Sequence, residues 1–198
     1  HKPSHLFHYV SLAYQSYFIS NMATEMLKEM NFDLLRLGDL KANFKEVEPI
    51  MRNTDFLSFD ISSIQYAYAQ ANVYSSPNGL TGEEACKTMR YAGVSDKLSA
   101  IGLFEYNQEL DINNQTAQLL SQMLWYFIDG YIIRKQELNP SLKNCIQYTV
   151  AFEDGKNEIV FYKSKSSGRW WMGVPFKKEG EKQLQNYFVA CSYRDYEL

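Results

Sequence analysis

The sequence alternates between helix-like and strand-like segments, and this alternation constrains the fold more than any other feature. Apolar runs at residues 32–38, 56–61 and 98–106 are almost continuous, which is typical of strands buried on both faces. Segments with helical character separate these runs. Such an order favours a parallel sheet with helices on both faces. We therefore expect an α/β fold with three layers (helix, sheet, helix) and a mainly parallel sheet.

Four segments are predicted as the helices of this pattern: residues 7–30, 42–52, 83–92 and 114–135. Thr81 can cap the third helix, and Glu83 and Glu84 lie in its first turn, where the helix dipole favours anions. The fourth helix is the most regular, because apolar residues recur every three or four positions on one face. This predicted face consists of Ala117, Leu120, Leu124, Phe127, Ile128 and Tyr131.

The pattern changes after Pro140. Residues 146–152 alternate between apolar and polar or small types, Asp154 and Gly155 indicate a turn, and the alternation resumes at residue 159, which predicts a β-hairpin. A further strand is expected at residues 170–176, and one short helix in the tail after Lys177. We divide the chain into an α/β body, residues 1–140, and an antiparallel extension, residues 141–198.

Two features of the extension have simple structural interpretations. Trp170 and Trp171 are adjacent in a predicted strand, so their side chains point to opposite faces, and we expect one of them to be buried. The charged run at residues 163–169 is most simply a solvated loop, because no wider basic surface joins it.

Composition and charge exclude several classes of function. The 198 residues carry a net charge of −3 with a pI of about 5.7, which gives no electrostatic reason to bind nucleic acid or anionic lipid. No apolar stretch reaches the roughly 18 residues of a membrane span. Three scattered cysteines and the polar start of the chain predict a cytoplasmic protein without a signal peptide. A start without Met is consistent with a segment that begins inside a longer protein.

Two carboxylates follow predicted strands, at the position where open α/β sheets bind ligands. Asp60 closes the strand at 56–61, and Glu105 lies at the end of the strand at 98–106. A carboxylate that closes an apolar strand needs a partner or a metal ion. Two alternatives stay open at this point: Asp60 can serve as a turn or helix cap, and Glu105 can form an ion pair with a nearby Lys or Arg.

Three motifs stand out in this part of the sequence: the strand end LSFDI at residues 57–61, the helix entry NGLTGEE at 78–84 and the strand LSAIGLFEYN at 98–107. Together they resemble the ureohydrolase superfamily, which includes arginase, agmatinase and formimidoylglutamase. The family has Ser-Phe-Asp-x-Asp, Gly-Gly-Leu-Thr and Leu-Ser-x-x-Asp-x-x-Glu-x-Asn-Pro in this order, followed by a long helix. The resemblance covers about residues 32–135, the second half of a family domain.

The resemblance implies a binuclear manganese site that hydrolyses a C–N bond in a linear amidine, either a guanidino or a formimino substrate. Asp60 matches a metal-binding Asp, and Ser62 stands where a second metal-binding Asp occurs in the family. Glu105 matches the Glu that orients the cationic head of the substrate. Two manganese ions would polarise the substrate and lower the pKa of bound water.

Several positions depart from the family pattern. Gly102 replaces an Asp, Gln108 replaces a Pro, and the Asp-x-His-x-Asp and Gly-Gly-Asp-His motifs do not occur in the sequence. His5 and His8 are three residues apart and could share one face of a helix, but capping or solvated histidines are the simpler interpretation.

Three functional interpretations follow from the sequence. The first is the C-terminal part of a ureohydrolase that acts on a small amidine or guanidino substrate. The second is a non-catalytic descendant that binds or assembles, and the third is an unrelated α/β binding module. Under the first two we expect a homo-oligomer, because the aromatic extension offers an apolar patch.

Overall fold

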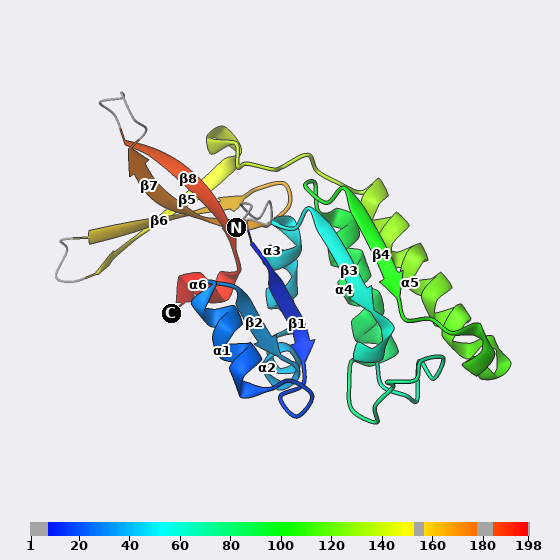
Figure 1. The fold of residues 1–198 in the computed structure, drawn as a ribbon. Helices are drawn as coiled ribbons and strands as arrows, with labels where there is room; N and C mark the ends of the chain where they lie inside the picture. The colour runs from blue at the N-terminus through cyan, green and yellow to red at the C-terminus, as the bar shows by residue number, and fades with distance from the viewer. Residues whose placement is uncertain (1–7, 153–156, 178–183, 198) are drawn as a thin grey trace, which may run out of the picture. The chain divides into compact units, whose positions relative to one another are not determined.

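The computed structural model describes residues 8–152, 157–177 and 184–197 (Figure 1). The described residues fall into two compact units: one from the described part of residues 1–44 with 58–88 and 101–126, and one from residues 45–57 and 89–100 with the described part of 127–198. Each unit is built from three separate segments of the chain. This division does not correspond to a single boundary in the sequence, and the predicted boundary at residue 140 stays a prediction.

The α/β fold is confirmed, because parallel strand pairs alternate with helices. β1 pairs with β2 in parallel, with Val10 opposite Asp33, and β3 pairs with β4, the two arrows pointing the same way in Figure 1. Among the described residues, no helix has the length and apolar character needed to cross a membrane. The elements of this part are β1 (Val10–Tyr14), α1 (Asn21–Glu29), β2 (Asp33–Arg36), α2 (Leu37–Ala42), α3 (Val47–Arg52), β3 (Phe56–Asp60), α4 (Gly82–Val94), β4 (Ala100–Phe104) and α5 (Gln115–Ile132).

The predicted helix at residues 7–30 is wrong in its first half. Residues 10–14 form β1, and the helix α1 begins only after Ser20, whose Oγ accepts a hydrogen bond from Ala23 N at 3.2 Å. The absence of Pro and Gly is compatible with a strand as well as a helix, and pairing with β2 satisfies the backbone of this segment. The predicted helix at 42–52 is likewise divided, since α2 ends at Ala42 and α3 begins at Val47.

The long helix α5 is present, but its buried face is not the predicted one. Leu124, Ile128 and Tyr131 of the predicted face are exposed. The side chains that are buried lie on a face shifted around the helix, at Thr116, Leu119 and Met123. Apolar residues occur on both faces of α5, so their spacing alone did not identify the side that meets the core.

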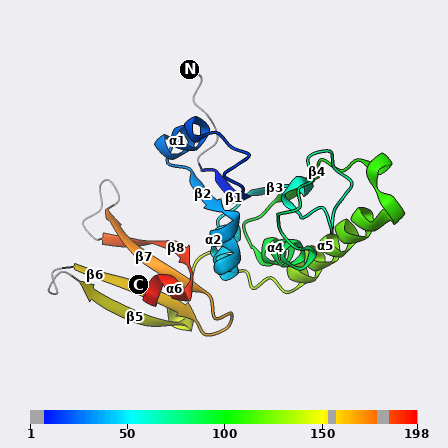
Figure 2. The same ribbon diagram turned by 90° about the horizontal axis from the view of Figure 1, so that it is seen from below.

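Glycines bring α4 and α5 together in the second unit, where the two helices run side by side (Figures 1 and 2). A Cβ atom added at Gly93 would lie 2.2 Å from the carbonyl oxygen of Phe127. One added at Gly130 would lie 2.6 Å from the carbonyl oxygen of Arg90. Only a residue without a side chain fits at these two positions.

The C-terminal part forms a four-stranded antiparallel sheet in the order β5-β6-β7-β8, which confirms the antiparallel extension. The predicted turn at Asp154 and Gly155 lies outside the described residues. The tail holds an additional strand, β8, before the short helix that was expected there. The elements are β5 (Cys145–Phe152), β6 (Asn157–Ser164), β7 (Trp170–Lys177), β8 (Leu184–Cys191) and α6 (Tyr193–Glu197).

Both tryptophans of β7 are buried, whereas the sequence predicted one. Trp171 packs in a cluster with Cys145 and Tyr162, and Trp170 packs on the other side of the strand with Phe161 and Cys191. The short helix α6 supplies Tyr196, which stacks on Trp170 with ring centroids 5.2 Å apart. Both faces of this sheet are therefore covered near Trp170 and Trp171.

Candidate functional site

Asp60 closes β3, as the sequence predicted, and its side chain caps the following turn. Its Oδ1 accepts a hydrogen bond from Ser62 N at 2.8 Å, and its carbonyl oxygen accepts one from Ser63 Oγ at 2.7 Å. The capping role left open by the sequence is therefore present. The residue is exposed, so its second carboxylate oxygen can still reach a ligand.

Glu105 follows β4, the strand paired with β3, and its backbone has an unusual conformation. Its φ is +67°, a left-handed value that residues with a side chain adopt rarely and that is frequent at functional sites. The carbonyl oxygen of Glu105 accepts a hydrogen bond from Asn72 Nδ2 at 2.8 Å, which holds this conformation. Within the described residues the carboxylate forms no ion pair, so the predicted alternative of a Lys or Arg partner is not observed.

The loop between β3 and α4 positions the end of β4. Ala71 lies at its centre: its carbonyl oxygen accepts a hydrogen bond from Asn107 N at 2.9 Å, and its N–H donates to Thr116 Oγ1 at 3.1 Å. Thr116 belongs to α5 and is fully buried. Sequence reasoning missed Asn72 and Thr116, because nothing local indicates that a loop and a distant helix meet at the end of β4.

The Asn-Gly-Leu-Thr segment forms the other side of this loop. Leu80 pairs with Ile64 in an isolated bridge, and Gly79 lies so close to the backbone that an added Cβ would be 2.6 Å from Ser63 O. Thr81 and Glu84 exchange hydrogen bonds, Thr81 N to Glu84 Oε2 at 2.8 Å and Glu84 N to Thr81 Oγ1 at 3.2 Å. This capping box confirms the predicted start of α4.

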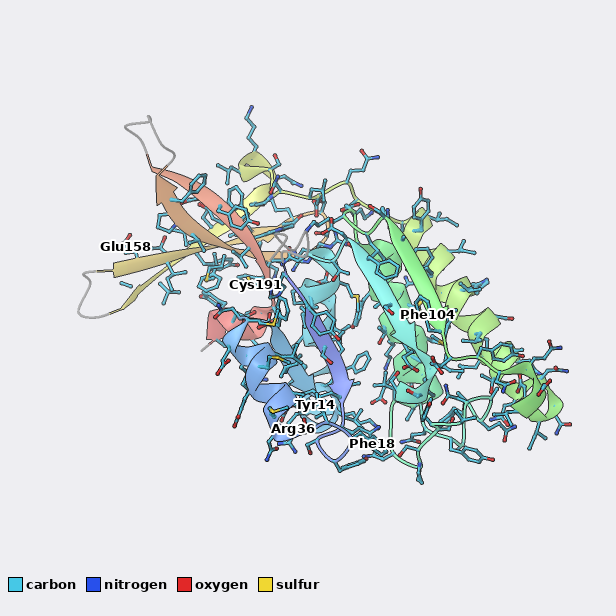
Figure 3. The ribbon with its side chains drawn as sticks, viewed as in Figure 1. Tyr14, Phe18, Arg36, Phe104, Glu158 and Cys191 are labelled. Carbon is cyan, nitrogen blue, oxygen red and sulfur yellow. The ribbon has the colours of Figure 1, made fainter. Side chains whose placement is uncertain are left out.

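The two substituted positions have structural consequences. Ser62, at the place of the second family Asp, donates its N–H to Asp60 and brings no negative charge. At Gly102 a Cβ atom would lie 2.4 Å from the ring of Phe104. Phe104, labelled at the end of β4 in Figure 3, therefore occupies the space that the Asp of the family motif would need.

The residues present do not fit a binuclear manganese centre. No group of three or more His, Cys, Asp or Glu side chains that could hold a metal ion occurs within the described ranges. Two divalent ions need several carboxylate and imidazole ligands, whereas Asp60 is the single matched ligand. His8 instead contacts Asp33, with Nε2 3.0 Å from Oδ2, and His5 lies outside the described residues.

The structure thus defines an α/β protein with two carboxylates at the ends of adjacent parallel strands, and comparison with known proteins identifies its family. The arginase family profile matches residues 7–129, more than half of the chain. This chain belongs to the arginase family. A search of curated protein sequences gave no match.

Solved structures show the same fold. Formimidoylglutamase from Bacillus subtilis subsp. subtilis str. 168 is 19% identical with a TM-score of 0.58, over 64% of this chain and 42% of that one. Trypanosoma cruzi formiminoglutamase with Mn2+ is 17% identical with a TM-score of 0.57, over 63% of this chain and 43% of that one. Helicobacter pylori arginase is 20% identical with a TM-score of 0.53, over 62% of this chain and 42% of that one. The chain thus spans less than half the length of these relatives.

Proposed function

We propose that the chain recognises a linear amidine, either a guanidino or a formimino compound, at the carboxyl ends of β3 and β4. The supporting observation is Glu105: its backbone is held in a left-handed conformation, and its carboxylate has no ion-pair partner within the described residues. A planar amidinium presents parallel N–H donors that match the two oxygens of a carboxylate. Asp60, at the end of the neighbouring strand, adds a second negative charge.

For a complete protein that contains this chain, we propose hydrolysis of the C–N bond of this ligand, as in the ureohydrolases that the motifs resemble. The described residues do not supply the manganese ligands for such a reaction. Hydrolysis therefore requires ligands from outside these residues. The contribution of this chain is to bind and orient the cationic head of the substrate through Glu105.

A second candidate function, binding or assembly without catalysis, is favoured by Ser62 and Gly102. Both positions lack the carboxylate that the family motif has there, and the ring of Phe104 fills the space beside Gly102. A protein without these carboxylates could still bind an amidine through Glu105 without catalysing the reaction.

The test combines binding and turnover on the full-length protein. Calorimetry with agmatine, arginine and formimidoylglutamate is compared between the wild type, Glu105→Gln and the control Glu109→Gln, which removes another exposed carboxylate four residues away. Because a charge-assisted contact is lost, we expect Glu105→Gln to bind at least about tenfold more weakly than the wild type, and Glu109→Gln to bind as the wild type does. Release of urea or formamide with added manganese supports hydrolysis, and binding without turnover supports the non-catalytic function. If none of the three compounds binds, or both variants bind equally well, the proposal is wrong.

A further inference from the structure

A second candidate site is lined entirely by residues of the other compact unit. It is a cavity of about 490 Å³, and neither Asp60 nor Glu105 lines it. Its walls come from α3 and the residues just before it, from α4 and from the segment after α5. The turn between β6 and β7, the start of β7, the end of β8 and the start of α6 complete them. Cavities of roughly 300–1,000 Å³ are typical of small-molecule sites.

More cationic than anionic side chains line this cavity. Lys45, Lys135 and Arg169 line it together with a single carboxylate, Glu48. Glu48 Oε1 lies 3.1 Å from Arg52 Nε and 3.3 Å from Arg169 Nε, so its charge is already compensated inside the protein. Lys45 and Lys135 are exposed and form no ion pair with any described residue. The cavity therefore has two ammonium groups available for an anion.

Arg169 fixes one wall of the cavity. Its side chain is only 9% exposed; Nη1 lies 3.2 Å from Asp96 Oδ2, and Nη2 donates to the carbonyl oxygen of Val94 at 2.7 Å. The sequence predicted a solvated loop at residues 163–169, which is wrong for Arg169. Its partners come from α3, α4 and the residues after α4, and local sequence does not indicate these contacts.

The turn that carries Arg169 is also held by internal hydrogen bonds. Gly168 has a φ of +72° and donates its N–H to Ser164 O at 3.0 Å. Glu137 accepts hydrogen bonds from Ser164 Oγ at 2.8 Å, Ser166 Oγ at 2.6 Å and Ser167 Oγ at 2.5 Å. The hydroxyls of this turn are thus engaged, which leaves the two lysines as the charged groups that can meet a ligand.

The remaining walls are apolar or aromatic. Pro49, Val94, Ile133, Trp170 and Tyr193 line the cavity, and Tyr193 is 52% exposed. Cys191, labelled in Figure 3, also lines it, and burial together with nearby carboxylates raises the pKa of its thiol to about 12. The thiol is therefore neutral and adds to the apolar surface.

We propose that this cavity binds a small organic anion whose apolar or aromatic body rests on these walls and whose negative group contacts Lys45 and Lys135. The buried ion pairs of Arg169 hold the site in place before the ligand arrives, which lowers the entropic cost of binding. The fixed turn and the neutral thiol fit reversible binding without covalent chemistry.

The experiment uses two fluorescent probes that share an N-phenylnaphthylamine skeleton. 8-Anilinonaphthalene-1-sulfonate carries a negative charge, and N-phenyl-1-naphthylamine does not. Both are titrated into the full-length wild type, the double variant Lys45→Gln/Lys135→Gln, and the control Lys28→Gln/Lys143→Gln. The control removes two lysines that are also exposed but do not line the cavity, and circular dichroism verifies that the variants are folded.

We expect the Lys45/Lys135 variant to bind the anionic probe roughly tenfold more weakly. Its affinity for the neutral probe and the affinities of the control variant should stay within about twofold of the wild type. If the anionic probe binds both double variants equally, or if the wild type binds the neutral probe as tightly as the anionic one, the proposal is refuted. Neither outcome depends on Glu105, so this test is independent of the amidine site.

Discussion

Replacing Glu48 by Gln tests how the second unit accommodates its buried charges. The side chains of Arg52 and Arg169 are 5% and 9% exposed, and Glu48 Oε1 is the shared anion between them. Burial lowers the pKa of Arg52; Glu48 opposes this shift, and the neighbouring Arg169 adds to it. Without the carboxylate, two like charges would remain buried near each other.

The expected loss in the free energy of unfolding depends on the hydrogen bonds and ion pairs that each arginine retains without Glu48. Removing one partner of a buried ion pair costs about 3–5 kcal/mol. Glu48 is 23% exposed, Arg52 Nη2 still donates to the carbonyl oxygens of Trp170 and Cys191 at 3.0 and 2.8 Å, and Arg169 keeps Asp96. We therefore expect a loss near or below the lower limit, about 2–3 kcal/mol, which corresponds to a decrease in Tm of roughly 5–10 °C.

Urea unfolding followed by circular dichroism measures this loss. The matched control is Glu83→Gln, which breaks the exposed pair of Glu83 with Lys87 at the same four-residue spacing; this variant should be close to the wild type in stability. A double-mutant cycle with Arg52→Met isolates the pair energy. If Glu48→Gln is destabilised no more than Glu83→Gln, then Glu48 does not compensate the buried arginines and the reasoning fails.

Three further changes test other parts of the structure. Gly93→Ala should lower the free energy of unfolding by about 1–3 kcal/mol, because the Cβ atom of the alanine would overlap the carbonyl oxygen of Phe127. If the urea unfolding curve is unchanged, α4 and α5 are not in such close contact. Partial desolvation raises the pKa of Asp111, but hydrogen bonds from Thr116 N and Ala117 N outweigh it and lower the pKa below the ordinary 3.8. The ionised Asp111 carboxylate therefore stabilises the fold fully above pH 3.8, and this contribution decreases as the pH falls through the lowered pKa. We expect Asp111→Asn to be less stable than the wild type at pH 7, with a smaller difference in the free energy of unfolding in acid. If that difference is the same at both pH values, the assignment is wrong. With a thiol pKa of about 12, Cys191 should react with a disulfide reagent at pH 8 much more slowly in the folded protein than in urea. Rapid labelling of the peptide that contains Cys191 in the folded state would show that this thiol is not buried.

Local sequence determined much of the α/β part. The predicted strand at residues 56–61 and the helix at residues 83–92 correspond to β3 and α4, and the predicted cap at Thr81 is present. These features depend on short-range patterns: an apolar run, a capping residue and acidic side chains in the first turn. The position of Asp60 and Glu105 at strand ends follows from the same patterns. Their proposed role in amidine recognition stays untested.

Only the tertiary structure determined the features that depend on residues far apart in the chain. The segment at residues 10–14 is a strand because it pairs with β2, and the buried face of α5 is set by what packs against it. Glu105 keeps its left-handed backbone through Asn72, and Arg169 is buried because Glu48 and Asp96 approach it from other elements. Hydrogen bonds and ion pairs between residues far apart in the chain leave no periodic signal in the sequence. Local preference could therefore place the ends of the strands, while only the folded chain determined which side chains pair with another described residue and which do not.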